Sequence, residues 1–420
     1  MTAGHDLQSD ERKTALYVQV PFCRARCAYC DFNTYAGIEP LIPAYVAAVC
    51  REIEAVGREW GPLVVPTVYF GGGTPSIVPP DLLAQVYHVV ERTFGVPEDV
   101  EVTLEANPGT VTPAVLRGLL ELGVNRLSLG AQSAHDDELQ FLGRIHRWEQ
   151  VLETVEAARV AGFDSLSLDF IFGLPGQTLA RWRRTLEAAL TLGPEHLSLY
   201  GLTIEEGTPL ERSIAAGQVP PPDDDAAAEM YELAEDVLAN AGYFHYEISN
   251  WARIGPRPQV RHLQAQTWWP SPAERDPMPD PRSEGVSPYV CRHNLTYWRN
   301  QSWFGVGAGA HSWWDGHRWA NVRHPREYVV AVTQGDMTAV EVEAIDRRLE
   351  MGETMMLGLR LAEGVSDVRF RSRFGVGMEA VFAEQLADLQ AVGLLEWDKR
   401  VARLTARGRL LGNQVFGAFV

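Results

Sequence analysis

Between residues 15 and 203 the chain repeats one pattern of apolar and polar positions: a short apolar run, a loop, and a longer segment with helical spacing. The short runs predict β-strands at 15–20, 67–70, 100–105, 126–130, 165–172 and 196–202. The longer segments predict helices near 41–60, 80–94, 112–122, 148–161 and 178–192. Strands that alternate with helices of this length form parallel βαβ units with right-handed crossovers. The pattern therefore predicts an α/β fold, an open, partial (β/α)6 barrel.

The pattern changes after the sixth unit. A helix is expected at about 224–241, followed by the strand-like run "YEIS". Residues 254–290 hold eight of the 26 prolines, so neither a helix nor a central strand can persist there. We interpret this segment as an exposed, Pro-rich insertion. Its Trp268 and Trp269 are candidates for a cap over a ligand or for an exposed patch that binds a partner.

From about residue 341 the sequence has three helical patterns, then "LLEWDKRVARLT", in which two apolar runs flank a charged turn, and a last helix from Ala406. This order predicts a small C-terminal α+β domain of the winged-helix type. Such domains often bind DNA, but residues 340–420 carry 11 basic and 12 acidic side chains, which favours a structural role. The expected organisation is a polar N-terminal tail (1–14), the barrel with its extension (15–253), the insertion (254–290), a segment rich in Trp, Gly and His (291–340) and the C-terminal domain (341–420).

Composition and charge exclude several classes of function. Apolar residues make up 46% and charged residues 22% of the chain, as in ordinary folded domains. The net charge of −18 opposes non-specific binding to nucleic acid, which depends on Lys and Arg neutralising phosphates. The polar start of the chain has no signal-peptide core, and no stretch reaches the length of a membrane span. We therefore expect a cytoplasmic protein.

Three of the five cysteines, Cys23, Cys27 and Cys30, follow the first predicted strand within "PFCRARCAYCDF". Thiolates are soft ligands that select zinc, copper(I) or iron–sulfur clusters. A structural zinc site would need a fourth ligand, and the next residues, "DFNTYAG", offer neither Cys nor His. Three thiolates on a four-iron cluster leave one iron open to a small molecule. The alternative is three buried thiols on one helix face, which Pro21 and the flanking Arg24 disfavour.

The segment "CRARCAYC" resembles the CxxxCxxC signature of radical S-adenosylmethionine (SAM) enzymes, whose open iron chelates the amino and carboxylate groups of SAM. The flanking "LYVQVPFC" and "CDFNTY" are similar in particular to the HemW family of haem chaperones, which is related to the oxygen-independent coproporphyrinogen III oxidase HemN. The resemblance covers nearly the whole chain except the insertion. It implies a [4Fe-4S] cluster on the three cysteines, SAM as a cofactor, and haem as a cargo for recipient haemoproteins. It also leaves membrane association possible, although no amphipathic or polybasic segment requires it.

The resemblance implies a SAM site at the ends of successive strands, formed by Tyr17, Gly72, Gly73, Thr74, Glu105, Gln132, Arg144 and Asp169. The glycines of "GGGTPS" let the backbone approach a ligand closely, and the Lys of a phosphate loop is missing there. By resemblance this turn flanks the methionine end of SAM, and Glu105 takes a ribose hydroxyl. Taken singly, the glycine turn is equally consistent with a plain tight turn and Tyr17 with a core residue, whereas Glu105, Gln132 and Arg144 are better explained as polar surface residues.

Asp169 interrupts the apolar strand "SLSLDFIFGLPG". An ionised carboxylate in a buried strand costs several kcal/mol unless it is paired or hydrogen-bonded. We therefore expect a partner, either Arg144 in a salt bridge or the adenosine of SAM. The resemblance favours the adenosine.

Two functions of different classes fit the resemblance. One is the radical decarboxylation of a porphyrinogen propionate, as in HemN, and the other is haem binding and delivery, as in HemW. HemN-like oxidases have CxxxCxxCxC, whereas position 32 here is Phe32, and the HemW motif is intact as "HNLTYW" at 293–298. We therefore favour a haem chaperone over an oxidase and leave open whether the chain is an enzyme.

Imidazole is a natural axial ligand of haem iron, and aromatic rings pack on porphyrins, so we predict His293 as the ligand with Tyr297 and Trp298 beside the haem. A hydrogen-bonded structural histidine is an equal alternative. If the motif is a strand, His293 and Tyr297 share one face and Trp298 lies on the other. Cys291 is a weaker candidate ligand, and His311 in "GVGAGAHSWW" marks either a haem cleft or a packed seam. The oligomeric state is unknown from these residues.

Overall fold

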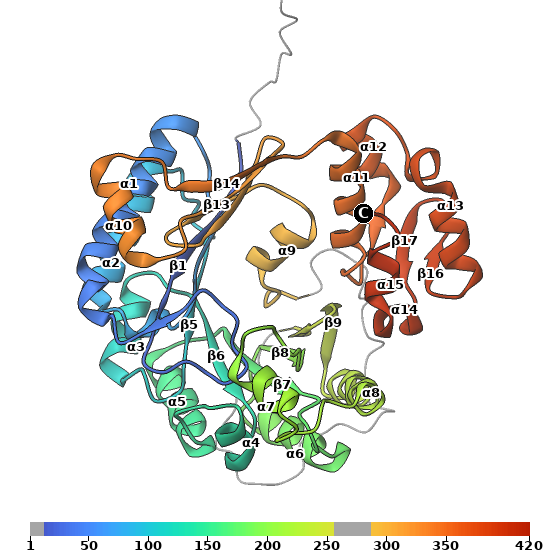
Figure 1. Ribbon diagram of the computed structural model, residues 1–420, viewed down its shortest axis with the longest axis horizontal. Coiled ribbons are helices and arrows are strands. Elements are labelled where there is room, and N and C mark those ends of the chain that lie inside the picture. The colour runs from blue at the N-terminus through green and yellow to red at the C-terminus, as the bar shows by residue number, and fades with distance from the viewer. Residues whose placement is uncertain (1–11, 256–286) are drawn as a thin grey trace, which may run out of the picture.

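The computed structural model describes residues 12–255 and 287–420. The six predicted strands form a continuous parallel sheet in chain order, β1 (Ala15–Val20), β4 (Thr67–Gly72), β5 (Glu101–Ala106), β6 (Arg126–Gln132), β7 (Leu166–Phe172) and β8 (His196–Gly201). The predicted helices follow as α1 (Ile42–Trp60), α2 (Pro80–Thr93), α3 (Pro113–Glu121), α5 (Trp148–Ala161) and α6 (Leu179–Thr191). These helices cover the outside of the curved sheet (Figure 1). The partial (β/α)6 barrel is confirmed.

The apolar periodicity explains this arrangement. On α1 the buried residues Tyr45, Val46, Val49 and Ile53 recur with helical spacing, so one face of the helix packs on the sheet. The central strands are buried on both faces, as is usual for parallel sheets covered by helices. The structure adds elements that the pattern did not predict, namely β2 (Phe22–Cys23), β3 (Tyr35–Ala36), α4 (Asp136–Phe141), α7 (Pro209–Ala215) and the 3-10 turns at Glu39–Leu41 and Pro75–Ile77.

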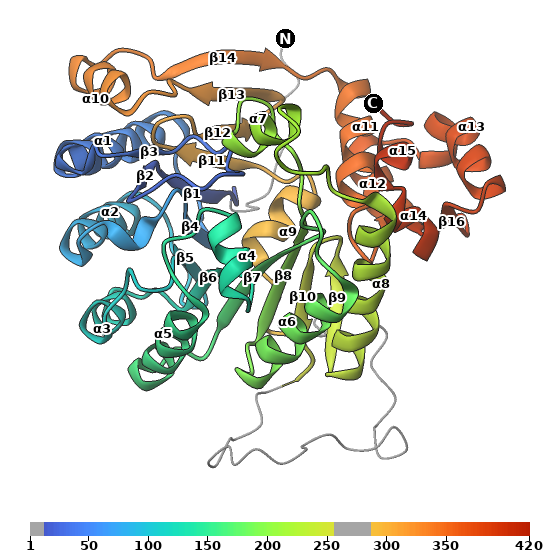
Figure 2. The ribbon, with the colours of Figure 1, turned by 60° about the horizontal axis from the view of Figure 1, so that its bottom comes forward.

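The sheet extends beyond the six barrel strands at both edges and has twelve strands in all within the described residues. Beside β8 lie β10 (Asn250–Arg253) and β9 (Tyr243–Glu247), which follow α8 (Asp224–Asn240). Beside β1 lies β11 (Trp303–Val306), parallel to it, and then the antiparallel strands β12 (His311–Trp314), β13 (His317–Asn321) and β14 (Ala339–Ala344), with α10 (Pro325–Gln334) between the last two. Figure 2 shows these strands stacked beyond β1. The segment rich in Trp, Gly and His is therefore part of the same sheet.

The "HNLTYW" motif forms a helix, α9 (Arg292–Trp298), and not a strand. Glu101 of β5 accepts hydrogen bonds from the backbone N–H groups of Arg292 and His293, at 2.9 and 3.0 Å. A carboxylate at this position satisfies donors that the first turn of a helix leaves unpaired. The helix lies within the curve of the sheet (Figure 1).

The C-terminal domain consists of α11 (Arg347–Gly358), β15 (Val365–Ser366), α12 (Asp367–Phe374), α13 (Met378–Ala391), β16 (Leu395–Trp397), β17 (Val401–Leu404), α14 (Ala406–Leu410) and α15 (Gly412–Phe416). The predicted hairpin is β16–β17, and the helix expected from Ala406 is α14. Met355, Phe370, Phe374 and Phe382 lie in a hydrophobic core of its own. Trp268 and Trp269 lie outside the described residues. In the described parts of the chain, no helix combines the length and the apolar character needed to cross a membrane.

Candidate functional site

The three clustered cysteines lie at the carboxyl end of β1, where barrel folds place their active-site loops. Cys23 ends β2 and is buried, whereas Cys27 and Cys30 are partly exposed. Two backbone hydrogen bonds of Ala28 hold the loop, one to the Leu142 carbonyl at 3.1 Å and one from the Leu210 N–H at 2.9 Å. None of the five cysteines, all of which lie in the described residues, forms a disulfide.

Burial raises the pKa of the Cys23 thiol, a hydrogen bond from Thr74 lowers it, and the neighbouring Cys30 and Cys27 raise it. Burial also raises the pKa of Cys30. In the parts of the chain that the structure describes, no three Cys, His, Asp or Glu side chains converge on the position of one metal ion. Metal binding by this loop is therefore inferred from its thiols and from the groups around them.

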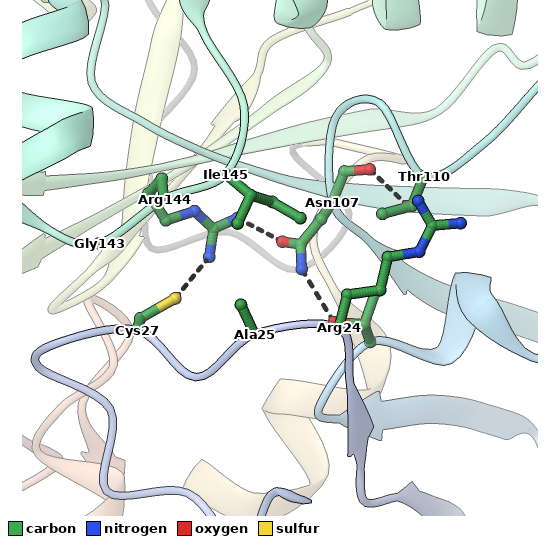
Figure 3. Close-up of a pocket in the computed structure, with 9 residues that line it drawn as sticks. Arg24, Ala25, Cys27, Asn107, Thr110, Gly143, Arg144 and Ile145 are labelled. Carbon is green, nitrogen blue, oxygen red and sulfur yellow. Dashed lines mark hydrogen bonds between the residues drawn. The ribbon is translucent and has the colours of Figure 1, made fainter. Parts of the chain in front are cut away.

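A chain of hydrogen bonds joins Cys23 to Cys27, and Figure 3 shows its part from Cys27 through Arg144 to Asn107. Thr74 Oγ1 lies 3.6 Å from Cys23 Sγ and accepts a hydrogen bond of 2.9 Å from Asn107 Nδ2. Arg144 donates to Asn107 Oδ1 and lies 3.4 Å from Cys27 Sγ. Two predicted SAM residues, Thr74 and Arg144, thus contact the cysteines directly. Asn107 was missed, although its place two residues after Glu105 at the end of a predicted strand could have indicated it.

The glycines of the "GGGTPS" turn allow β4 to reach the cysteine loop. A Cβ atom on Gly73 would lie 2.6 Å from the Phe22 carbonyl oxygen and 3.1 Å from Cys23 Sγ. Gly72 has a positive φ of 112°, and a Cβ there would lie 2.4 Å from the Gln19 amide. Only glycine fits at both positions, so this turn provides the close backbone approach that a bound SAM would need.

Glu105 is held by groups from β4. It accepts hydrogen bonds from the Tyr69 hydroxyl at 2.8 Å and from the Gly72 N–H at 3.1 Å. Burial raises its pKa to about 7, against the opposing effect of the Tyr69 hydrogen bond. Tyr17 stacks on Tyr69 with ring centroids 6.0 Å apart and donates to Gln19 Oε1 at 2.9 Å. Sequence reasoning missed Tyr69 and Gln19.

Glu105 lines a cavity of about 380 Å³, formed by Tyr17, Gln19, Phe32, Asn33, Gly72, Glu105, Gly309, His311, Ala320, Arg323 and Glu341. The cavity thus joins three predicted SAM residues to groups from the loop after the cysteines and from β12, β13 and β14. Its volume falls within the range of about 300–1,000 Å³ that is typical of small-molecule sites.

Asp169 has the partners that its buried position required. Its carboxylate accepts hydrogen bonds from the Ser128 hydroxyl at 3.0 Å and from the Ser167 hydroxyl at 3.2 Å. Burial raises its pKa, and serine hydroxyls lower it in part. Arg144 points to Cys27 and Asn107, so the alternative of a salt bridge between Asp169 and Arg144 is wrong for these described residues.

Gln132 ends β6 with a positive φ of 65°, at a position where the pairing with β7 shifts register. A Cβ atom on the neighbouring Gly130 would lie 2.8 Å from Gln132 Nε2 and 3.2 Å from Arg144. The side chains of Gln132 and Arg144 therefore both lie next to Gly130. Thr74 after β4, Asn107 after β5 and Arg144 after α4 thus lie beside the cysteine loop.

His293 is buried on α9, and both of its ring nitrogens are engaged. Nδ1 lies 2.9 Å from Thr67 Oγ1, and Nε2 lies 2.8 Å from the Tyr297 hydroxyl. Its ring lies against Tyr69 and Tyr17, with centroids 5.0 and 6.3 Å apart. Burial lowers the pKa of His293 to about 3, so the ring is neutral. In this conformation neither nitrogen is available to haem iron.

The other aromatic residues of the motif also pack against protein groups. The Arg360 guanidinium lies 4.5 Å from the ring centroid of Trp298, on the side of the C-terminal domain. Tyr297 packs edge-on against Trp303, with centroids 4.9 Å apart. Cys291 is fully buried, and burial raises its pKa to about 12. The motif thus bridges the barrel and the C-terminal domain, whereas His311 is exposed and lines the cavity.

Two protein-family models match separate parts of the chain, and individual proteins match nearly its full length. Residues 17–189 match the radical SAM superfamily, and residues 345–411 match the HemN C-terminal domain. The chain is 34% identical over 405 residues to "Heme chaperone HemW" of Bacillus subtilis, covering 96% of this chain and 98% of that protein. It is 36% identical over 363 residues to the protein of the same name from Synechocystis, covering 84% and 79%.

A vertebrate relative and a solved structure extend the comparison. "Radical S-adenosyl methionine domain-containing protein 1, mitochondrial" of Danio rerio is 31% identical over 426 residues, covering 98% of this chain and 88% of that protein. The structure of coproporphyrinogen III oxidase (HemN) from Escherichia coli, a radical SAM enzyme, superposes with a TM-score of 0.79 at 22% identity. It covers 98% of this chain and 91% of that one. At this identity the structural likeness shows the fold.

Proposed function

The chain belongs to the HemW family of radical SAM proteins, and on that premise we propose that it binds haem and transfers it to recipient haemoproteins while carrying a [4Fe-4S] cluster and SAM. The observation that carries the proposal is the match to a heme chaperone over 96% of this chain and 98% of the relative. The match therefore includes the cysteine loop, the α9 motif and the C-terminal domain together.

Cys23, Cys27 and Cys30 would hold the cluster through their thiolates. When bound, such a cluster supplies an electron to SAM at its open iron. The surroundings of the loop fit this role, because Thr74 and Arg144 reach the sulfur atoms of Cys23 and Cys27. Hydrogen bonds and a positive charge at sulfur favour the thiolate over the thiol. These two side chains would thus lower the cost of the deprotonated state and orient the ligands.

SAM would lie among Tyr17, Gly72, Gly73, Thr74, Glu105, Gln132, Arg144 and Asp169. Gly72 and Gly73 leave room for backbone contact with its methionine end. The Tyr69 hydroxyl and the Gly72 N–H each donate to one oxygen of Glu105, and each oxygen keeps a lone pair that can accept a hydrogen bond from a ribose hydroxyl in the cavity. Asp169 is already hydrogen-bonded by Ser128, Ser167 and Ser198, and its carboxylate oxygens have further lone pairs that could accept from the adenosine.

The alternative function is oxygen-independent oxidation of coproporphyrinogen III. The observation in its favour is the superposition with HemN at a TM-score of 0.79. Against it stands Phe32, which is 63% exposed at the position where HemN-like oxidases have a fourth cysteine. A phenyl ring can neither bind iron nor relay an electron through sulfur, so this loop is the less suited to the oxidase reaction.

His293, Tyr297 and Trp298 remain the haem residues proposed from the sequence motif. For His293 to ligate iron through Nε2, the Tyr297 hydroxyl would have to leave its 2.8 Å contact. Trp298 would have to turn away from Arg360 to reach the same haem. The motif could therefore bind haem only with a rearrangement of α9.

The test compares the two functions in one preparation. The protein is reconstituted anaerobically with iron and sulfide, then divided between two assays. In the first, ferric haem is added and its transfer to an apo-haemoprotein is followed by absorption; we expect uptake and transfer. In the second, coproporphyrinogen III, SAM and a reductant are added, and we expect no protoporphyrinogen. Protoporphyrinogen formation, or a failure to take up haem, would overturn the chaperone proposal.

A further inference from the structure

The cavity beside Glu105 has a stretch of wall that the proposed SAM residues do not use. His311 of β12 pairs with Ala320 of β13, and Ala320 pairs with Glu341 of β14. All three residues line the cavity. Residues directly opposite one another in neighbouring strands lie on the same face of a sheet. The three side chains therefore lie on one face of the sheet, with the small Ala320 between His311 and Glu341.

Asn33 fixes this wall to the cysteine loop. Its Nδ2 donates to the carbonyl oxygens of Ala308 at 3.0 Å and Arg323 at 2.9 Å. Gly309 has a φ of 73°, and a Cβ there would lie 2.4 Å from Asn33 Nδ2, so only glycine permits the approach. The turn that carries His311 and the residue Arg323 are therefore held beside the loop that carries the cysteines.

The exposed groups on this wall suit one chemical class of ligand. The His311 ring forms no hydrogen bond within residues 12–255 and 287–420, so an imidazole nitrogen is available. Phe32 is 63% exposed and lines the same cavity. Arg323 also lines it, and its guanidinium makes no ion pair with any described residue. An available imidazole, an exposed aromatic ring and an unpaired guanidinium match an iron porphyrin with carboxylate arms.

We propose that haem binds against this wall of the cavity, with His311 as the axial ligand, Phe32 against the porphyrin face and Arg323 paired with a propionate, while Tyr17, Gly72 and Glu105 on the barrel strands stay with SAM. The inference rests on the proposed function, because haem is the cargo of the family. It places haem beside the cysteine loop and assigns the α9 motif to fixing the C-terminal domain on the barrel. The contrast with His293 is direct: that ring has both nitrogens engaged and no exposed surface.

The test is a titration of ferric haem into the purified full chain, followed by the Soret absorption. We expect His311→Ala to bind haem at least about tenfold more weakly and to lose the spectrum of a histidine-ligated haem. His317→Ala is the matched control, because His317 is exposed on the adjacent strand β13 and does not line the cavity. Phe32→Ala should weaken binding without changing the ligand-dependent spectrum. Free imidazole added to His311→Gly should restore that spectrum.

The outcomes separate the two proposals. If the wild type takes up no haem, the proposed function fails and this inference fails with it. If the wild type binds haem and His311→Ala binds it within twofold and with the same spectrum, only the present inference is overturned. Tyr297→Phe supplies a second readout, because it frees Nε2 of His293 while leaving both rings in place. Tighter binding in Tyr297→Phe that persists in the double variant with His311→Ala would assign the ligand to His293.

Discussion

Tyr69 donates a hydrogen bond of 2.8 Å from its hydroxyl to Oε1 of Glu105. The same tyrosine ring lies 5.0 Å from the ring of His293, so one side chain contacts both the predicted SAM pocket and the motif helix. A displacement of α9 would move the ring that fixes Glu105. The two parts of the molecule are therefore coupled through a packed aromatic pair.

The first prediction concerns the pH dependence of stability. Burial raises the pKa of Glu105 to about 7, so the folded chain takes up a proton at higher pH than the unfolded chain does. The stability contributed by this carboxyl is fully present below its unfolded pKa and is lost as the pH rises through 7. Relative to Glu105→Gln, the wild type should lose on the order of 3 kcal/mol of unfolding free energy between pH 5 and pH 8. Urea denaturation at these two pH values measures the difference.

Glu247 provides the control for this experiment, because burial also raises its pKa to about 7. Glu247→Gln should remove its own part of the pH dependence and leave the Glu105 part. A Glu105→Gln variant whose stability follows that of the wild type at every pH would contradict the burial-raised pKa.

The second prediction tests the close approach of β4 to the cysteine loop. In Gly73→Ala the new methyl group would meet the Phe22 carbonyl oxygen at 2.6 Å, so the loop must shift at a cost of about 1–3 kcal/mol. Iron incorporation and SAM affinity should both fall. The control is Gly118→Ala on α3, where the nearest atom would be 3.6 Å away and a gain of about 0.5–1 kcal/mol is expected. Equal melting temperatures and equal iron content in the two variants would disprove the steric argument.

The third prediction concerns the metal. Cys27→Ser should retain the fold but lose most of the iron bound after anaerobic reconstitution, since two thiolates hold a cluster poorly. Cys50 is a partly buried thiol on α1, so Cys50→Ser changes one thiol outside the loop. Iron and sulfide analysis of both variants, beside the wild type, is the measurement. Loss of iron from Cys50→Ser, or full iron in Cys27→Ser, would place the metal elsewhere.

The barrel could be predicted because its strands and helices are defined by local apolar patterns. The extension of the sheet could not be predicted, because β11 pairs with β1 from a distant part of the sequence, with Ala15 opposite Trp303. The edge strand β14 has mostly exposed positions, so no apolar face marks it. These segments form strands because they pair with distant strands in the folded protein, and a single sequence does not reveal such pairing.

In the candidate site, too, some features could be predicted from the sequence and others could not. The positions at strand ends followed from the fold, and the structure brings Thr74, Arg144 and Cys27 together there. The neighbours of His293 could not be deduced, because Thr67 is 226 positions away in the sequence. A histidine in an aromatic motif suggests a ligand as readily as a core residue. Only the contacts of both ring nitrogens distinguish these roles.

The last prediction compares the two histidines for stability. His293→Ala removes a buried ring and leaves the Thr67 and Tyr297 hydroxyls without their partner, at an expected cost of about 2–4 kcal/mol in unfolding free energy. His311→Ala removes an exposed ring and should change that energy by less than about 0.5 kcal/mol. Urea denaturation of both variants measures the difference. The loss of a buried ring can also weaken haem binding indirectly, by destabilising the fold. Weaker haem binding by His293→Ala therefore indicates a lost ligand only if this variant is as stable as the wild type. Such equal stability would also contradict the structural role that the contacts of His293 assign to it.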